Sequence, residues 1–250
     1  MRDYSRLGRM LGFVVIGGLL LAACSAVSKV PTVQATAQSQ GLPTATPLPV
    51  DDGGQDAGAN MAAIQAQKAL SALLKVDASA VTVGTVETVQ WPSTCLGVEI
   101  PGQMCAMHVV DGYRVILEAG GQRYEYHTNG DGSALQPALA LTWHREGGIA
   151  GFCDDLVINV VGEAAVGSCR GSPPTEEQFT LLKEQQRAEL GKWLSTLRPF
   201  TVEYTDPAVA DAMTIRLVFG GWGTTEASDA QKQAVGELAA ELYAAMSGNN

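Results

Sequence analysis

The N-terminal segment constrains this 250-residue chain more than any other feature, because it sets the compartment in which the cysteines fold. Residues 1–9 carry three arginines and one aspartate, and residues 10–23 form an unbroken run of apolar residues and glycine. This layout is typical of a secretory signal peptide. The run is too short for a transmembrane helix, which needs roughly 20 residues to cross about 30 Å of hydrocarbon. We therefore expect residues 1–23 to be removed and the remainder to fold in an oxidising compartment.

The run ends in Leu21-Ala22-Ala23-Cys24, which resembles the lipobox of bacterial lipoproteins. The resemblance implies that Cys24 is acylated, with palmitate among its acyl chains, and becomes the mature N-terminus. The alternative is an ordinary cleaved signal followed by an incidental cysteine. Two or more acyl chains attach a protein stably to a membrane. We therefore expect an extracytoplasmic protein of the bacterial cell envelope, with the membrane as a partner through the Cys24 lipid.

Residues 24–59 are expected to form a tether. From residue 25 onward the segment has no aromatic residue and no cysteine, and it is dominated by Ala, Thr, Gln, Ser, Pro, Gly and Asp. Such a composition buries too little apolar surface to offset the entropy lost on ordering. A flexible chain of this length spans about 30 to 35 Å root-mean-square. The folded part is therefore expected to stand away from the membrane.

Negative charge limits the classes of partner. Loss of residues 1–23 leaves 13 Lys plus Arg against 25 Asp plus Glu, a formal charge of −12. A surface of this sign repels nucleic acid and anionic lipid headgroups. We expect no nucleic-acid partner, and an envelope protein, a peptide or a carbohydrate is compatible with the composition.

Four cysteines remain once Cys24 is assigned to lipid, and an even number in an exported chain favours disulfides. Pairing of neighbours, Cys95 with Cys105 and Cys153 with Cys169, closes the shortest loops, although three connectivities are possible. Each short loop would contribute about 3 kcal/mol. Neither pair has the close Cys or His spacing of a zinc site, so we expect no metal and no cofactor.

The remaining residues predict an α+β fold of two small helix-plus-antiparallel-sheet modules, residues 60–133 and 134–250, or one bilobed domain. In the first module, a helix over 60–75 begins at an Asn60 N-cap and presents Ile64, Leu70, Leu73 and Leu74. A strand over 81–91 contains a bulge near Gly84. Two further strands form a hairpin around Gly120-Gly121.

The second module alternates strands and helices in the same way. Strands are predicted in ALALTWHRE, DLVINVV, AAVGSC and MTIRLVFGG, with a hairpin at Gly162-Glu163. A helix is expected to begin at a Thr175/Gln178 capping box and to end at Pro199. Its apolar positions are Phe179, Leu182, Leu190, Trp193, Leu194 and Leu197. A last helix starts at a Ser228/Gln231 capping box and presents Val235, Leu238, Leu242 and Met246.

A pattern in the first module resembles one found in uncharacterised exported bacterial lipoproteins. It consists of Trp91-Pro92, Leu96-Gly97, Gly112-Tyr113-Arg114 and Tyr124-Glu125-Tyr126-His127-Thr128. The resemblance covers about 70 residues and implies no activity. The helix-plus-hairpin layout is also similar to PepSY and cystatin-like folds, which are associated with protease inhibition.

Several residues are candidates for binding or chemistry. Tyr124 and Tyr126 lie on one strand face and could bind a peptide or sugar, or pack in the core, with Glu125 and His127 on the opposite face. Trp222, in a glycine-rich loop, could stack on carbohydrate or close a strand end. Residues 128–133, TNGDGS, suggest a calcium loop, but the EF-hand positions for Gly and Glu hold Ala, so we predict a turn.

The sequence contains no G-x-S-x-G, H-E-x-x-H, S-x-x-K or Walker A motif, and no catalytic residue is assigned. We therefore expect a noncatalytic binding or interaction module. One alternative is an envelope hydrolase that uses Asp154, Asp155 or His127. Another is a protease inhibitor that inserts the Cys95–Cys105 loop into an enzyme cleft.

Overall fold

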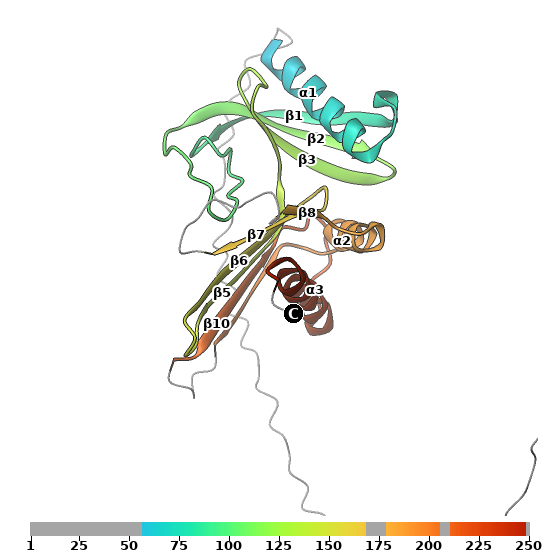
Figure 1. The fold of residues 1–250 in the computed structure, drawn as a ribbon. Helices are drawn as coiled ribbons and strands as arrows, with labels where there is room; N and C mark the ends of the chain where they lie inside the picture. Colours follow the sequence, from blue (N-terminus) through green and yellow to red (C-terminus); the bar gives the residue numbers. More distant parts are fainter. Residues whose placement is uncertain (1–56, 169–178, 206–210, 249–250) are drawn as a thin grey trace, which may run out of the picture. The chain divides into compact units, whose positions relative to one another are not determined.

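The structure, a computed structural model, describes residues 57–168, 179–205 and 211–248. The predicted α+β class is confirmed, since helices pack against two antiparallel sheets (Figure 1). The expected signal peptide and Cys24 lie outside the described residues, as does the tether up to residue 56. None of the described helices is long and apolar enough to cross a membrane.

The first sheet has four strands in the order β1-β2-β3-β4, and one helix lies along one of its faces (Figure 1). The Gly120-Gly121 hairpin between β2 and β3 is confirmed, with both glycines at positive φ. The elements are α1 (Ala57–Leu74), the 3-10 turn η1 (Ala78–Ala80), β1 (Val81–Trp91), β2 (Val110–Ala119), β3 (Gln122–Asn129) and β4 (Leu135–Pro137).

The predicted inward face of α1 is confirmed at Leu70, which is buried, and at Leu73 and Leu74, which pack against the core, but it is wrong at Ile64. Asn60 lies inside the helix, which begins at Ala57, and Ile64 is 54% exposed. Ala62, Ala66 and Leu70 are fully buried, and Ser71 is 7% exposed. The small side chains of Ala62 and Ala66 let the helix backbone approach the sheet. These alanines therefore face inwards, and the larger Ile64 points to solvent.

The predicted bulge in β1 decides which of its residues face α1. The pairing register with β2 shifts between Val83 and Val86. An added residue turns the following side chains to the other face of the sheet. As a result Val81 joins the main core, whereas Val89 and Trp91 pack on the opposite face with Leu96.

The second sheet has six strands in the order β8-β7-β6-β5-β10-β9. The hairpin at Gly162 is confirmed, with a φ of 85° between β6 and β7. The elements are β5 (Leu139–Gly147), β6 (Phe152–Asn159), β7 (Glu163–Ser168), β8 (Phe179–Leu181), α2 (Glu184–Thr196), β9 (Phe200–Thr205), β10 (Met213–Phe219) and α3 (Asp229–Met246).

The predicted start of the helix before Pro199 is wrong. Phe179 is in β8, which pairs with β7, and α2 begins only after Lys183. The Lys183 backbone N–H donates to the Gln186 side chain and caps the helix there. The proposed Thr175/Gln178 capping box lies outside the described residues. The start of this segment instead extends the edge of the second sheet by pairing with β7. The spacing of its apolar residues fits a helix and gives no sign of this pairing partner elsewhere in the sequence.

The last helix is confirmed with its predicted cap. The Ser228 hydroxyl accepts a hydrogen bond from the Gln231 N–H, and the Gln231 side-chain oxygen accepts one from the Ser228 N–H. Val235, Leu238 and Leu242 are buried, and Met246 packs at the edge of the core. One cluster of buried residues includes side chains of α1, both sheets, α2 and α3. Strand β9, by contrast, was not predicted.

Candidate binding site

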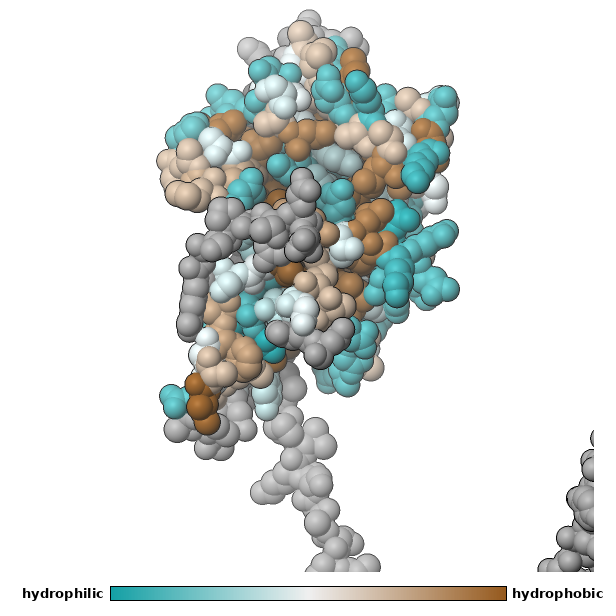
Figure 2. Space-filling view, in the orientation of Figure 1, coloured by the Kyte–Doolittle hydropathy of each residue, from teal (hydrophilic) through white to brown (hydrophobic). Residues whose placement is uncertain are grey.

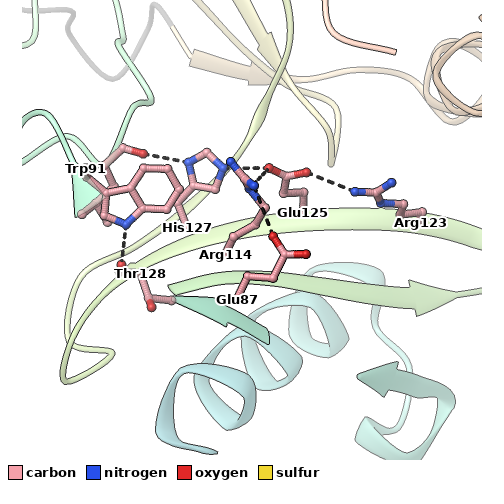
Figure 3. A network of polar contacts seen from close by, with 8 residues as sticks. Glu87, Trp91, Arg114, Arg123, Glu125, His127 and Thr128 are labelled. Atoms are coloured by element: carbon pink, nitrogen blue, oxygen red, sulfur yellow. Dashed lines mark hydrogen bonds and ion pairs between the residues drawn. The ribbon is translucent and has the colours of Figure 1, made fainter. Parts of the chain in front are cut away.

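A ladder of alternating charges crosses the face of the first sheet that α1 does not cover (Figure 3). Arg114 of β2 lies between two carboxylates, with its Nη1 3.3 Å from Glu87 and its Nε 3.1 Å from Glu125. Arg123 contributes a further contact of 3.4 Å to Glu125. Strand alternation sends these side chains to one face and Tyr113, Val115 and Leu117 to the other.

His127 extends the ladder towards the loop after β1. Its Nε2 lies 3.0 Å from the Glu125 carboxylate and its Nδ1 2.7 Å from the Leu96 carbonyl oxygen. The imidazole stacks on the Trp91 indole at 4.1 Å between ring centroids. The Trp91 Nε1–H donates to the Thr128 carbonyl at 2.9 Å, which fixes the indole on the sheet.

Glu125 is the centre of this ladder. Burial favours its neutral form, but the hydrogen bond with His127 and the charges of His127, Arg114 and Arg123 outweigh burial, so the pKa of Glu125 lies below its usual value. A hollow of about 590 Å³ opens beside Glu87, Arg114 and Glu125. Because Glu87, Arg114, Arg123 and Glu125 are paired with one another, the hollow offers a ligand few uncompensated groups.

The loop from Cys95 to Cys105 is closed by a disulfide, as predicted, with 5.5 Å between the Cα atoms. We refer to residues 95–105 as the stapled loop. Its first half folds inwards, since Leu96 and Val98 are 1% and 2% exposed. Leu96 has a φ of 56°, a conformation that non-glycine residues rarely adopt, and its carbonyl receives the His127 hydrogen bond.

The stapled loop also reaches the second sheet. A side-chain carbon at Gly167 of β7 would stand 2.6 Å from the Pro101 side chain, so the loop lies directly against the backbone of β7. Any larger residue at position 167 would push the loop away. The loop therefore touches both sheets, held by His127 on one and seated on Gly167 of the other.

An apolar groove of about 330 Å³ lies between the stapled loop and the second sheet. Among the described residues that line it, Glu163 alone is charged, and its carboxylate accepts a hydrogen bond from Asn159. The volume is at the lower end of the range for small-molecule sites. The apolar lining residues are Val98, Ile100, Pro137, Leu139, Val157, Ala164, Ala165, Phe179 and Leu181.

One rim of this apolar groove is the edge strand β8. Phe179 and Leu181 are 45% and 46% exposed, although both are large and apolar. Figure 2 shows that apolar residues on the visible face gather in separate patches between hydrophilic ones. Exposed apolar side chains that border a concave surface are typical of binding sites.

The residues suggested as binding aromatics lie elsewhere. Tyr124 and Tyr126 are buried in the main core, on the opposite face of β3 from Glu125 and His127 as expected from strand alternation. Burial raises the pKa of both phenols. Trp222 is partly buried against the same core, and the Arg123 guanidinium lies 5.2 Å from its ring.

The candidate acids of β6 each contact a basic side chain. Asp154 pairs with Arg145, and Asp155 accepts a hydrogen bond from His144 at 2.8 Å. Contacts with Asp155 and Glu146 outweigh burial and raise the pKa of His144. The structure thus brings neither acid together with His127, whose partners are Glu125 and Leu96.

Two further predictions concern local structure. Residues 128–133 form the predicted turn, in which the Asp131 carboxylate accepts hydrogen bonds from the Ser133 N–H and hydroxyl. These bonds lower the pKa of Asp131. The Cys153–Cys169 disulfide remains a prediction, because Cys169 lies outside the described residues.

Sequence reasoning missed both the charged ladder and the apolar groove. Ladder members such as Glu87 and Arg114 are far apart in sequence and meet only through strand pairing. A signal for the groove was present in the stapled loop, where Leu96, Val98 and Ile100 alternate with polar residues or glycine. Apolar residues at every second position indicate an extended segment with one buried side.

A comparison with known families finds a similarity to DUF8738, a domain of unknown function, over residues 63–137. The matched segment begins inside α1 and ends with β4, so it covers the C-terminal part of the helix, the four strands of the first sheet and the stapled loop. No curated protein and no solved structure matches the chain.

Proposed function

We propose that this protein is a lipid-anchored, extracytoplasmic lipoprotein of the bacterial cell envelope that binds an apolar ligand without catalysing a reaction. The observation that carries the binding role is the apolar groove between the stapled loop and the second sheet. Its lining suits an uncharged group, or a cationic one that would approach Glu163. The ligand is a small apolar molecule or the apolar side chains of a protein or peptide partner.

The two alternatives receive less support. A hydrolase needs titratable groups that converge on one reacting atom, and Asp154, Asp155 and His127 each contact their own partners. An inhibitory loop needs a protruding segment, whereas the first half of the stapled loop is buried. Its second half is exposed, with Met104 at 94%.

Photo-crosslinking in cells tests the binding role. The full chain is expressed with benzoyl-phenylalanine in place of Phe179, on the rim of the apolar groove, and adducts are identified by mass spectrometry. Tyr204 on β9, at the other edge of the same sheet, is the matched control because it is 46% exposed. We expect adducts at position 179 and few at position 204.

A groove-filling variant provides the second arm. Ala165 lines the apolar groove and is 3% exposed, so Ala165→Leu reduces the space available to a ligand. The adduct at position 179 should be lost in this variant. Equal crosslinking at positions 179 and 204, or crosslinking that survives Ala165→Leu, would contradict the proposal.

The lipid anchor has its own test. Cys24→Ser removes the thiol that would be acylated, and we expect the protein to lose the N-terminal acyl mass measured on native material. The resemblance of Leu21-Ala22-Ala23-Cys24 to a lipobox supports this part of the proposal. An unmodified Cys24 in the wild-type protein would overturn it without affecting the groove.

A further inference from the structure

Both ring nitrogens of His127 face oxygen atoms that accept hydrogen bonds. The Leu96 carbonyl oxygen cannot donate, and the Glu125 carboxylate is held ionised by its surroundings. A neutral imidazole carries a single N–H and can satisfy one of these acceptors. The doubly protonated ring satisfies both, at 2.7 Å and 3.0 Å.

Two of the groups that contact His127 can interact favourably with a doubly protonated ring. Glu125 of β3 contacts the ring directly, and the Trp91 indole of β1 lies stacked on it. An aromatic face stabilises a positive charge. The other charged groups are Arg114, Arg123 and Glu87, and both guanidiniums contact the Glu125 carboxylate. The stapled loop presents a backbone carbonyl rather than a charge.

Loss of one proton would affect the two hydrogen bonds unequally. A bond to a carboxylate is about twice as strong as a bond to a neutral carbonyl. The neutral ring therefore keeps its proton on Nε2, towards Glu125, and gives up the proton on Nδ1. The lone pair of Nδ1 then faces the Leu96 carbonyl oxygen, and the bond to the stapled loop is lost.

That bond lies close to the apolar groove. Leu96 is held at positive φ two residues before Val98, and Val98 and Ile100 line the groove. A loop residue in this conformation persists only where its surroundings maintain it. The His127 contact is therefore placed to control the wall of the groove.

We propose that His127, in its doubly protonated form, is the positioning residue that holds the stapled loop as a wall of the apolar groove, and that raising the pH loosens this wall. The link to ligand binding rests on the proposed function. The protonation of His127 and the mobility of the loop do not, and they can be measured without a ligand.

Nitrogen-15 NMR of the full chain tests the protonation. The chain has three histidines, so labelling histidine alone gives a spectrum that single His→Gln variants assign. At about pH 5.5, both nitrogens of His127 should carry protons, and Nδ1 should lose its proton first as the pH rises. A neutral ring at this pH, or loss of the Nε2 proton first, would overturn the assignment.

Amide hydrogen exchange of the full chain tests the loop. The Leu96 amide donates to the carbonyl of Ser93, just before the stapled loop, and the Val98 amide donates to the carbonyl of Cys95. Between about pH 5.5 and pH 8, and after correction for intrinsic exchange, their protection should fall about ten-fold in the wild type. His127→Gln should abolish this pH dependence. His144→Gln, which removes another histidine in contact with carboxylates, should leave it unchanged.

A second variant covers the case in which His127→Gln does not fold. In Glu125→Gln the carboxylate that holds the proton on Nε2 is absent. The neutral ring can then keep its proton on Nδ1 and donate it to the Leu96 carbonyl oxygen. The loop should then stay protected at both pH values. Equal pH dependence in wild type and Glu125→Gln would contradict the proposal.

Crosslinking at position 179 connects the loop to the groove. If the His127 mechanism controls the wall, the adduct yield of the wild type should fall as the pH rises and that of His127→Gln should not change with pH. A yield that is independent of pH, while the loop amides do respond, would refute this link. Absence of the adduct at every pH would instead refute the proposed binding function.

Discussion

Gly112 lies in β2, directly beside the Trp91 indole of β1 and the backbone of β3. A side-chain carbon at this position would stand 1.9 Å from the Thr128 carbonyl oxygen and 2.8 Å from Trp91 Nε1. These two atoms form the hydrogen bond that orients the indole beneath His127. The absence of a side chain at position 112 is therefore a requirement of the site and not of a turn.

Gly112→Ala should lower the free energy of unfolding by about 2 to 4 kcal/mol, because the added carbon separates β2 from β3 and breaks the Trp91 bond. Gly130→Ala is the control, since the nearest atom to its added carbon is 3.5 Å away. Chemical denaturation followed by tryptophan fluorescence measures both variants. Similar losses in the two would show that the close approach at position 112 is not the cause.

Glu125 should make the stability depend on pH. Its pKa is lower in the folded protein than the reference value of 4.5, so its stabilising contribution is present above that value and is lost as the pH falls through the folded pKa. Glu125→Gln should cost about 1 to 3 kcal/mol at neutral pH, since it leaves Arg114 and Arg123 without their shared carboxylate.

Denaturation of wild type and Glu125→Gln over a range of pH checks this expectation. The difference between them should shrink below about pH 4.5. Glu87→Gln, whose side chain is 53% exposed, should change stability by no more than about 0.5 kcal/mol. A difference that stays constant into acid would show that the carboxylate charge is not responsible.

At the scale of the element, α1 illustrates how a helix chooses its buried face. Ala62 and Ala66 are fully buried, whereas Ile64 is exposed. A larger inward side chain would hold the helix further from β1 and β2. The face is thus selected by the distance at which the whole helix packs and not by the hydrophobicity of one residue.

Ala66→Leu should destabilise the protein by about 1 to 3 kcal/mol through overpacking. Ile64→Ala should change the stability by no more than about 0.5 kcal/mol, because this side chain is mostly in solvent. Thermal unfolding of the two variants distinguishes the faces. A larger loss for Ile64→Ala than for Ala66→Leu would reverse the assignment.

On the scale of the whole molecule, the two sheets share buried side chains. Leu117 of β2 and Leu156 of β6 belong to one core cluster. The Ala138 N–H, between β4 and β5, donates to the Glu125 carbonyl at 2.9 Å. When one element of a shared core unfolds, the side chains that it covered in the other elements become exposed to solvent, so these elements unfold together.

We therefore expect a single cooperative unfolding transition. Leu117 and Leu156 are both fully buried. Leu117→Ala and Leu156→Ala should each lower the midpoint of that one transition and reduce the free energy of unfolding by about 2 to 5 kcal/mol. Differential scanning calorimetry measures the number of transitions. Two separate transitions, each sensitive to one variant, would indicate two independent domains.

Local chemistry made several elements predictable. The Gly120-Gly121 and Gly162 hairpins, the bulge near Gly84 and the Ser228 cap of α3 each depend on residues a few positions apart. The pairing of Cys95 with Cys105 belongs to the same class, because a short loop brings these thiols together at low entropic cost. Strand alternation likewise separated Tyr124 and Tyr126 from Glu125 and His127.

Tertiary structure alone decided the rest. Pairing between strands brings Glu87 of β1, Arg114 of β2 and His127 of β3 to one face, and no local pattern specifies that meeting. The same holds for the apolar groove, whose walls come from the stapled loop and from β8. The physical reason is that turns and caps are satisfied within a few residues, whereas a helix face, an edge strand or a groove depends on which distant segment lies opposite.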